Sequence, residues 1–138
     1  MRALQSNTPF SPIVPTDRSG SGGFADRPDQ IGDPNDIGDR TPARFFNTAA
    51  FQLQAAGAFG NTGRNTINGP NFTSLDLAVL KNISLFGEHR VQLRLEIFNA
   101  LNNVNFLIPN RNFGTPQFGT VTAARDARSM QLGVKYLF

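Results

Sequence analysis

Cysteine is absent from this chain of 138 residues, and its absence excludes several kinds of chemistry. Disulfides, thiol nucleophiles and cysteine-ligated zinc sites all require it. Histidine is scarce too, because His89 is the only one, and a lone histidine without a second ligand or a nucleophile beside it rarely makes a metal or catalytic site. We therefore expect a protein that is not an enzyme and that has no cofactor.

Long apolar runs and helix-forming runs are also missing. No stretch reaches the roughly 18 consecutive apolar residues that a membrane-spanning helix needs. Charged residues make up only 17% of the chain, and the net charge of +3 comes from scattered basic residues, which argues against a nucleic-acid partner. The opening MRALQSNTPF lacks the apolar core of a signal peptide, so we expect a piece of a longer exported protein or a chain that is not exported.

The abundant residues are Phe (13), Gly (13) and Pro (9). Aromatic and glycine-rich strands joined by Asn, Gly and Pro turns are typical of all-β proteins. Residues 1–14 predict a weak strand end, because Pro9 and Pro12 interrupt them. Residues 15–71 and 104–127 predict two long loops, because they are rich in turn-forming residues and show no regular period.

Residues 72–103 predict a β-hairpin of two long strands, 72–86 and 90–101. Apolar residues take the odd positions in both strands, as expected when one face of a sheet is apolar. Both strands are long enough to cross a bilayer at a tilt of about 45°. The apolar face would hold Leu75, Leu77, Val79, Ile83, Leu85, Val91, Leu93, Leu95 and Ile97. The polar face would hold Asp76, Asn82, Arg90, Gln92, Arg94 and Glu96, as lumen-wall charges and amides.

The register of this hairpin follows from the shared odd numbering. Residues that oppose each other across two strands lie on the same face, so their numbers must add up to an even value. A three-residue turn at 87–89 meets this condition and a two-residue turn at 87–88 does not. The three-residue turn predicts Leu85 opposite Val91, Val79 opposite Ile97 and Lys81 opposite Leu95. It also predicts Asn82 opposite Arg94. Lys81 is the misfit on the apolar face, where it would snorkel toward a lipid head group.

Residues 128–138 predict a final strand, which pairs with the second strand of the hairpin. Its even positions are apolar: Met130, Leu132, Val134, Tyr136 and Phe138. An exposed apolar strand invites edge pairing, so we expect another structure to receive it. The pattern Gln131-x-Gly133-x-x-Tyr136-x-Phe138 resembles the C-terminal assembly signal of bacterial outer-membrane β-barrels. That resemblance implies the β-barrel assembly machinery as a partner.

Three longer stretches carry a family resemblance: FFNTAAFQLQAAGAFGNTGRNTINGPNFTSLDLAVLKNISL, VQLRLEIFNALNNVNF and FGTVTAARDARSMQLGVKYLF. They are similar to the C-terminal end of TonB-dependent outer-membrane receptors, particularly Oar-like receptors with an N-terminal carboxypeptidase-regulatory-like domain. The resemblance implies an antiparallel transmembrane barrel of about 22 strands with an internal plug. It implies uptake of a scarce substrate with energy passed on by the TonB system. The implied partners are outer-membrane lipid and the rest of the barrel and plug, in a Gram-negative type bacterium.

The lengths of the connections agree with this topology. Outer-membrane barrels have short periplasmic turns and long extracellular loops. With the turn at 87–89 in the periplasm, the loops 15–71 and 104–127 are extracellular, and the chain of 138 residues holds only part of the barrel.

Two alternatives stay open at this point. Asp29, Asp33, Asp36 and Asp39 supply enough oxygen ligands for Ca²⁺, yet their spacing is not that of an EF-hand loop, and a solvated loop is the plainer interpretation. The whole chain could instead be a soluble β-rich surface-binding or adhesion module. The two classes differ in where the apolar faces point, inward in a sandwich and outward to lipid in a barrel.

Overall fold

The structure is a computed structural model that describes residues 1–6 and 8–138. The described part of the chain consists of β-strands, irregular segments and one 3-10 helix, with no α-helix, which confirms the predicted all-β class. It forms two compact units. The strand unit contains Met1–Gln5, Phe72–Asn105 and Arg125–Phe138, and the loop unit contains Ser6–Asn71 and Phe106–Ala124. Within this part, no helix has the length and apolar character needed to cross a membrane.

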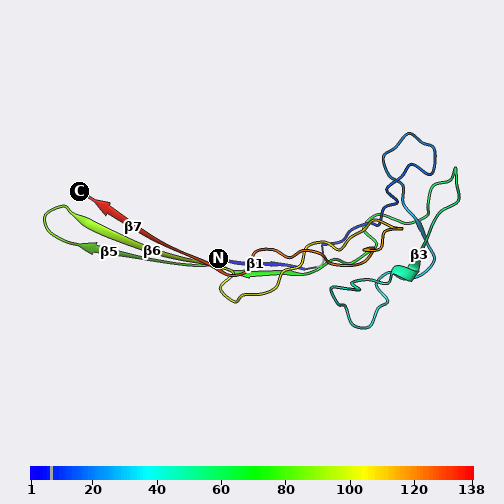
Figure 1. The fold of residues 1–138 in the computed structure, drawn as a ribbon. Helices are drawn as coiled ribbons and strands as arrows, with labels where there is room; N and C mark the ends of the chain where they lie inside the picture. Colours follow the sequence, from blue (N-terminus) through cyan, green and yellow to red (C-terminus); the bar gives the residue numbers. More distant parts are fainter. Residues whose placement is uncertain (7) are drawn as a thin grey trace. The chain divides into compact units, whose positions relative to one another are not determined.

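Three long strands dominate the strand unit (Figure 1). They are β5 (Leu77–Ser84), β6 (Arg90–Phe98) and β7 (Ser129–Leu137). They form an antiparallel sheet in the order β5-β6-β7, which confirms the predicted hairpin and the pairing of the last strand with its second arm. β-branched and aliphatic residues alternate with polar ones along these strands, and this pattern favours a pleated ladder over a helix.

The first arm of the hairpin is divided at Asp76. The short strand β4 (Phe72–Leu75) pairs with β1 (Arg2–Gln5), whereas β5 pairs with β6. The predicted single strand over 72–86 therefore changes its partner at this residue. The carboxylate of Asp76 accepts hydrogen bonds at 2.9 Å from the Asn99 N–H and from the Ser74 hydroxyl.

The turn of the hairpin differs from the prediction. The His89 N–H donates to the Phe86 carbonyl at 3.1 Å, which closes a two-residue turn at Gly87 and Glu88. Gly87 has φ +57°, the left-handed region that the first central position of such a turn requires. The Leu85 N–H donates to the carbonyl of the same His89 at 3.0 Å. Leu85 and Phe86 therefore both oppose His89, which makes a β-bulge. The extra residue makes the numbers of opposed residues add up to an even value again, which a two-residue turn alone would not allow.

The bulge shifts the hairpin by two residues from the predicted register. Lys81 lies opposite Leu93 and not Leu95, and Val79 lies opposite Leu95 and not Ile97. The other predicted partners are wrong by the same step: Asn82 opposes Gln92, and Leu85 opposes His89. Ile83, which the three-residue turn would place opposite Leu93, opposes Val91. The even sum itself is confirmed, so odd residues of β5 still share a face with odd residues of β6.

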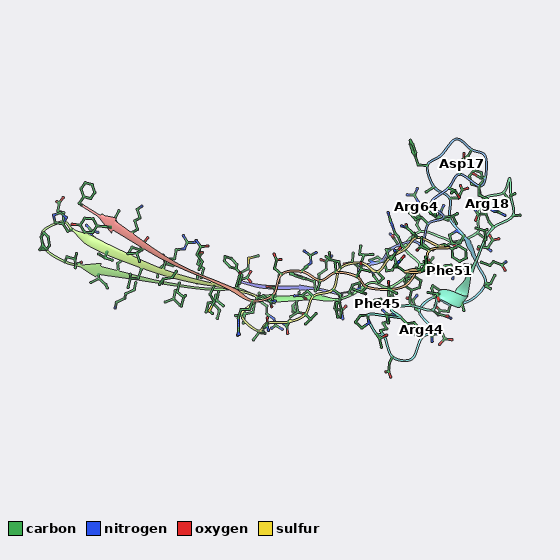
Figure 2. All side chains as sticks on the ribbon, in the orientation of Figure 1. Asp17, Arg18, Arg44, Phe45, Phe51 and Arg64 are labelled. Atoms are coloured by element: carbon green, nitrogen blue, oxygen red, sulfur yellow. The ribbon has the colours of Figure 1, made fainter. Side chains whose placement is uncertain are left out.

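The loop unit has its own hydrophobic core, although its sequence predicts mainly long loops, with a weak strand end up to residue 14 and a short helical turn or strand at residues 45–51. Two-residue strands β2 (Asp29–Gln30) and β3 (Phe51–Gln52) pair, and the 3-10 helix η1 (Thr48–Ala50) directly precedes β3. The ring of Phe46 is fully buried and makes edge-to-face contacts with three other rings, at centroid distances of 5.1 to 6.2 Å. Figure 2 labels Phe45 and Phe51, which flank η1. The core consists of Phe10, Phe45, Phe46, Ala50, Phe51 and Ile67, with Phe113, Phe118 and Val121 packed against it.

One glycine allows the two segments of the loop unit to approach closely. Gly119 has φ +86°, and a Cβ added there would lie 2.6 Å from the Thr48 methyl group. Its carbonyl accepts a hydrogen bond from the Phe45 N–H at 2.9 Å. A glycine is therefore required where residues 106–124 meet the segment around η1.

Candidate functional site

The first surface of interest is the apolar face of the sheet β5-β6-β7. Pairing brings Val79, Leu95 and Leu132 into one row across the three strands, and the neighbouring rows have the same character. β5 is exposed along its whole length, and Leu132 is 72% exposed. The face is formed by Leu77, Val79, Ile83, Val91, Leu93, Leu95, Ile97, Met130, Leu132, Val134 and Tyr136. Leu75 lies apart from it, in β4 opposite Arg2.

One cation interrupts this apolar face. Lys81 shares a row with Leu93 and Val134. The next row toward the turn ends on Tyr136. Two residues along a strand span about 6.7 Å, a distance that an extended lysine side chain nearly covers. Lys81 can therefore carry its charge to the level of Tyr136 while its methylene groups lie along apolar surface.

The opposite face of the same sheet is polar. Gln92 donates to the Asn82 side-chain oxygen at 3.0 Å, and Arg94 forms an ion pair with Glu96. Lys135 lies in the row of Gln92, and Gly133 lies opposite Arg94. Of the residues predicted for the polar face, Asn82, Gln92, Arg94 and Glu96 are thus gathered on one side of the sheet, whereas Asp76 lies outside it, between β4 and β5. Arg90 lies there as well, in the row of Ser84 and Leu137.

An aromatic cluster lies at the turn end of the apolar face. The Tyr136 hydroxyl and His89 Nδ1 share a hydrogen bond of 2.7 Å, and their rings stack with centroids 5.7 Å apart. Phe86 contacts the His89 ring at 4.7 Å, and Phe138 contacts the Tyr136 ring at 5.9 Å. Sequence reasoning gave His89 no role, because its neighbour Tyr136 is far along the chain. The pairing of β6 with β7 brings the two together.

The residues of the predicted assembly pattern are divided between the two faces. Tyr136 and Phe138 belong to the aromatic cluster, whereas Gln131 and Gly133 lie in rows with Glu96 and Arg94 on the polar side. The spacing of the pattern therefore presents two polar or small positions to one side and two rings to the other.

The strands end in a group of asparagines at the other end of the sheet. Asn99 and Asn102 have φ +49° and +53°, a conformation that asparagine tolerates better than most residues. The Asn105 side chain accepts from the Thr73 N–H at 2.8 Å and donates to the Thr73 carbonyl at 2.9 Å. The Asn105 side-chain amide thereby satisfies the backbone N–H and carbonyl of Thr73 in β4, as the backbone of a neighbouring strand would. Asn99 and Asn105 are both buried, so this end of the strand unit is held by side-chain hydrogen bonds.

A cleft of about 340 Å³ opens beside these asparagines within the strand unit. The residues that line it include Phe72, Phe98, Asp76 and Asp126. The guanidinium of Arg125 lies 4.9 Å from the centroid of the Phe72 ring, in a cation–π contact. Of these residues, sequence reasoning proposed only Asp76 as a site residue. The others fall in the predicted loop 104–127 or at strand ends, where no period marks them.

Asp17, Asp29 and Asp33 of the loop unit accept hydrogen bonds from backbone N–H groups. Asp17 accepts from the Gly22 N–H at 2.7 Å and the Ser21 N–H at 3.0 Å, and the Gly22 bond is the main cause that lowers the pKa of Asp17. Asp17 and the neighbouring Arg18 are labelled on this loop in Figure 2. In the predicted acidic loop, Asp29 accepts from the Asn61 N–H and Asp33 from the Asn35 N–H. Across residues 1–6 and 8–138, no three His, Cys, Asp or Glu gather to hold a metal ion.

The geometry defines the class of protein first: an antiparallel sheet whose long strands have one apolar and one polar face, joined by a short turn at one end and long connections at the other. That is the construction of a barrel wall. The family model of the outer membrane beta barrel domain matches residues 2–131. The chain therefore belongs to the outer membrane beta barrel domain family, and its location is the outer membrane. No curated protein and no solved structure matches the chain.

Proposed function

We propose that the chain is part of the barrel of a TonB-dependent receptor of the Oar-like type, which takes up a scarce substrate across the outer membrane of a Gram-negative bacterium. Its share of the work is barrel wall, extracellular loops that meet the substrate, and an assembly signal in β7. We propose no catalytic activity, no cofactor and no nucleic-acid partner. The partners are lipid, the assembly machinery, the remainder of the barrel with its plug, and TonB through that plug.

The observation that carries the proposal is the continuous apolar face of the sheet β5-β6-β7. Burial of one large apolar side chain is worth about 1.5 to 3 kcal/mol, so a face of this size exposed to water would favour aggregation. Lipid removes that cost without any protein partner. The polar face then lines the interior, where the Arg94–Glu96 pair and the Gln92–Asn82 hydrogen bond have water or the plug beside them.

The aromatic cluster supports the same orientation. Tyrosine and other amphipathic rings favour the boundary between hydrocarbon and water, and outer-membrane barrels carry such rings at both edges of their apolar band. Tyr136, His89 and Phe138 lie at the turn end of the band. In this orientation Gly87 is periplasmic, and the Lys81 ammonium reaches the same boundary.

The assembly role of β7 is tested in the intact parent receptor. Deletion of Phe138 should strongly reduce the amount of receptor in isolated outer membranes, because the signal is read before a barrel exists. Loss of a single ring is otherwise worth only about 1.5 to 3 kcal/mol. The matched control is Phe98→Ala, since Phe98 belongs to the polar face, opposite Ser129. If both changes reduce the amount of receptor in the outer membrane equally and only slightly, Phe138 is not part of an assembly signal.

The TonB dependence is tested separately by cross-linking the intact receptor to TonB in membranes. A cross-linked product that forms in the parent and disappears when its plug is deleted is the expected result. If no product forms, the receptor type is wrong while the barrel wall stands. A water-soluble, monomeric form of the present chain with a cooperative thermal transition would instead favour a soluble adhesion module.

A further inference from the structure

We propose that the cleft beside the asparagines binds a small zwitterion, an amino acid or short peptide that presents a carboxylate to Arg125 and an ammonium group to Asp76 and Asp126. The inference rests on the proposed uptake function, because it names a substrate class for it. The cleft belongs wholly to the strand unit, and its volume of about 340 Å³ is at the small end of the range for small-molecule sites.

Arg125 is prepared for an anionic group. Its guanidinium lies over the Phe72 ring, so the flat side of the cation is covered and its edge remains free to donate. Among the residues that the structure describes, the one ion pair is that of Arg94 and Glu96, so no carboxylate pairs with Arg125. A planar carboxylate offers two acceptors that match the fork of donors.

The two carboxylates prepare the cleft for a cationic group. Asp76 uses one oxygen, Oδ1, for its bonds to the Asn99 N–H and the Ser74 hydroxyl, and these two bonds fix the direction of the other oxygen. Asp126 is exposed at the same cleft. The Met1 ammonium donates to the Asp76 carbonyl oxygen, so the charges in and beside the cleft are two negative and two positive. Charges of both signs disfavour a simple anion and a simple cation alike. A ligand with one negative and one positive group can pair with Arg125 and with the aspartates at the same time.

The remaining walls suit an ordinary peptide unit. The amides of Asn99 and Asn105 are buried and engaged in hydrogen bonds with the backbone, so they form a rigid floor. The rings of Phe72 and Phe98 supply apolar surface on which a side chain can rest. Rigid polar groups around a partly apolar cleft bind with little cost of ordering the protein.

The test uses the full chain in maltoside micelles, whose uncharged head groups do not compete for the cleft. The probes are alanylalanine, its N-acetyl form and its C-terminal amide. Their binding is followed by the NMR shifts of the backbone amides of Asn99 and Arg125. We expect saturable binding of the free dipeptide and about tenfold weaker binding of each blocked form, since each has lost one charge-assisted contact.

Two variants assign the charges. Arg125→Gln should remove the preference for the free dipeptide over its amide but keep the preference over its N-acetyl form, and Asp126→Asn should weaken the second preference. Arg111→Gln is the control, because Arg111 is exposed and does not line this cleft. It should leave all three affinities unchanged.

Equal binding of the three probes, or no saturable binding by a chain whose β-sheet spectrum is intact, overturns the zwitterion site. Neither result bears on the proposal that the sheet is part of a barrel wall. That proposal fails only if the apolar face of the sheet does not contact lipid. The same probes and variants applied to the intact parent receptor in vesicles provide the second measurement, so that incomplete folding of the present chain in micelles does not decide the matter.

Discussion

Phe46 lies in the hydrophobic core of the loop unit. Its side chain is fully buried and makes edge-to-face contacts with Phe10, Phe51 and Phe118. Replacement of a core Phe by Ala costs about 3 to 5 kcal/mol, and the loss of three edge-to-face ring pairs favours the upper part of that range. We therefore place Phe46→Ala near 4 to 5 kcal/mol, by the same scale.

The assay is amide hydrogen exchange in the loop unit. The Phe10 and Ile67 amides donate to each other's carbonyls at 2.9 and 3.1 Å, so both are protected only while the core holds. A loss of 4 kcal/mol corresponds to about a thousandfold faster exchange, or to the unprotected rate if the unit is less stable than that. Phe24→Ala is the matched control because Phe24 is 101% exposed, and it should change the rates less than threefold, on the order of 0.5 kcal/mol. Similar rates in the two variants would refute a folded core.

Two further predictions concern the loop at Asp17 and the register of the hairpin. The Gly22 N–H lowers the pKa of Asp17, so the stabilisation of this loop is present above the ordinary aspartate pKa and is lost as the pH falls through the lowered pKa. The Gly22 amide resonance should shift in that window, and Asp17→Asn should abolish the shift; a titration that survives the substitution would contradict this. Oxidation should link cysteines introduced at Val79 and Leu95, which oppose each other, because opposed Cα atoms lie about 4.5 to 5.5 Å apart. Cysteines at Val79 and Ile97 should link poorly, and the reverse result would restore the register predicted from sequence.

The sequence was most informative where its apolar residues alternate. The period of two over the hairpin and β7 predicts the strands, the pairing of the strands and a shared apolar face, because the β-strand is the regular structure whose side chains alternate with this period. The exact register was not predictable in the same way. Parity excludes half of the registers, and the bulge beside Gly87 selects among the rest through hydrogen bonds that no alternation records.

Neither the core of the loop unit nor the cleft corresponds to a regular spacing of residues in the sequence. Phe10, Phe46 and Phe118 come from distant irregular segments, and no spacing links them. The cleft depends on the left-handed turn at Asn99 and on the Asn105 side chain, which replaces a strand partner. Both are tertiary contacts that a composition rich in Asn, Gly and Pro allows but does not specify.

The most direct test of the central claim is to measure which face of the sheet meets lipid. Nitroxide labels are placed singly at Val79 and Leu132 on the apolar face and at Gln92 and Gln131 on the polar face, in the parent barrel in lipid vesicles. Their accessibility is then measured to oxygen, which concentrates in hydrocarbon, and to a water-soluble nickel complex. We expect high oxygen and low nickel accessibility at Val79 and Leu132, and the opposite at Gln92 and Gln131. Equal accessibility at all four positions, or the reverse pattern, would contradict a barrel wall with this face toward the membrane.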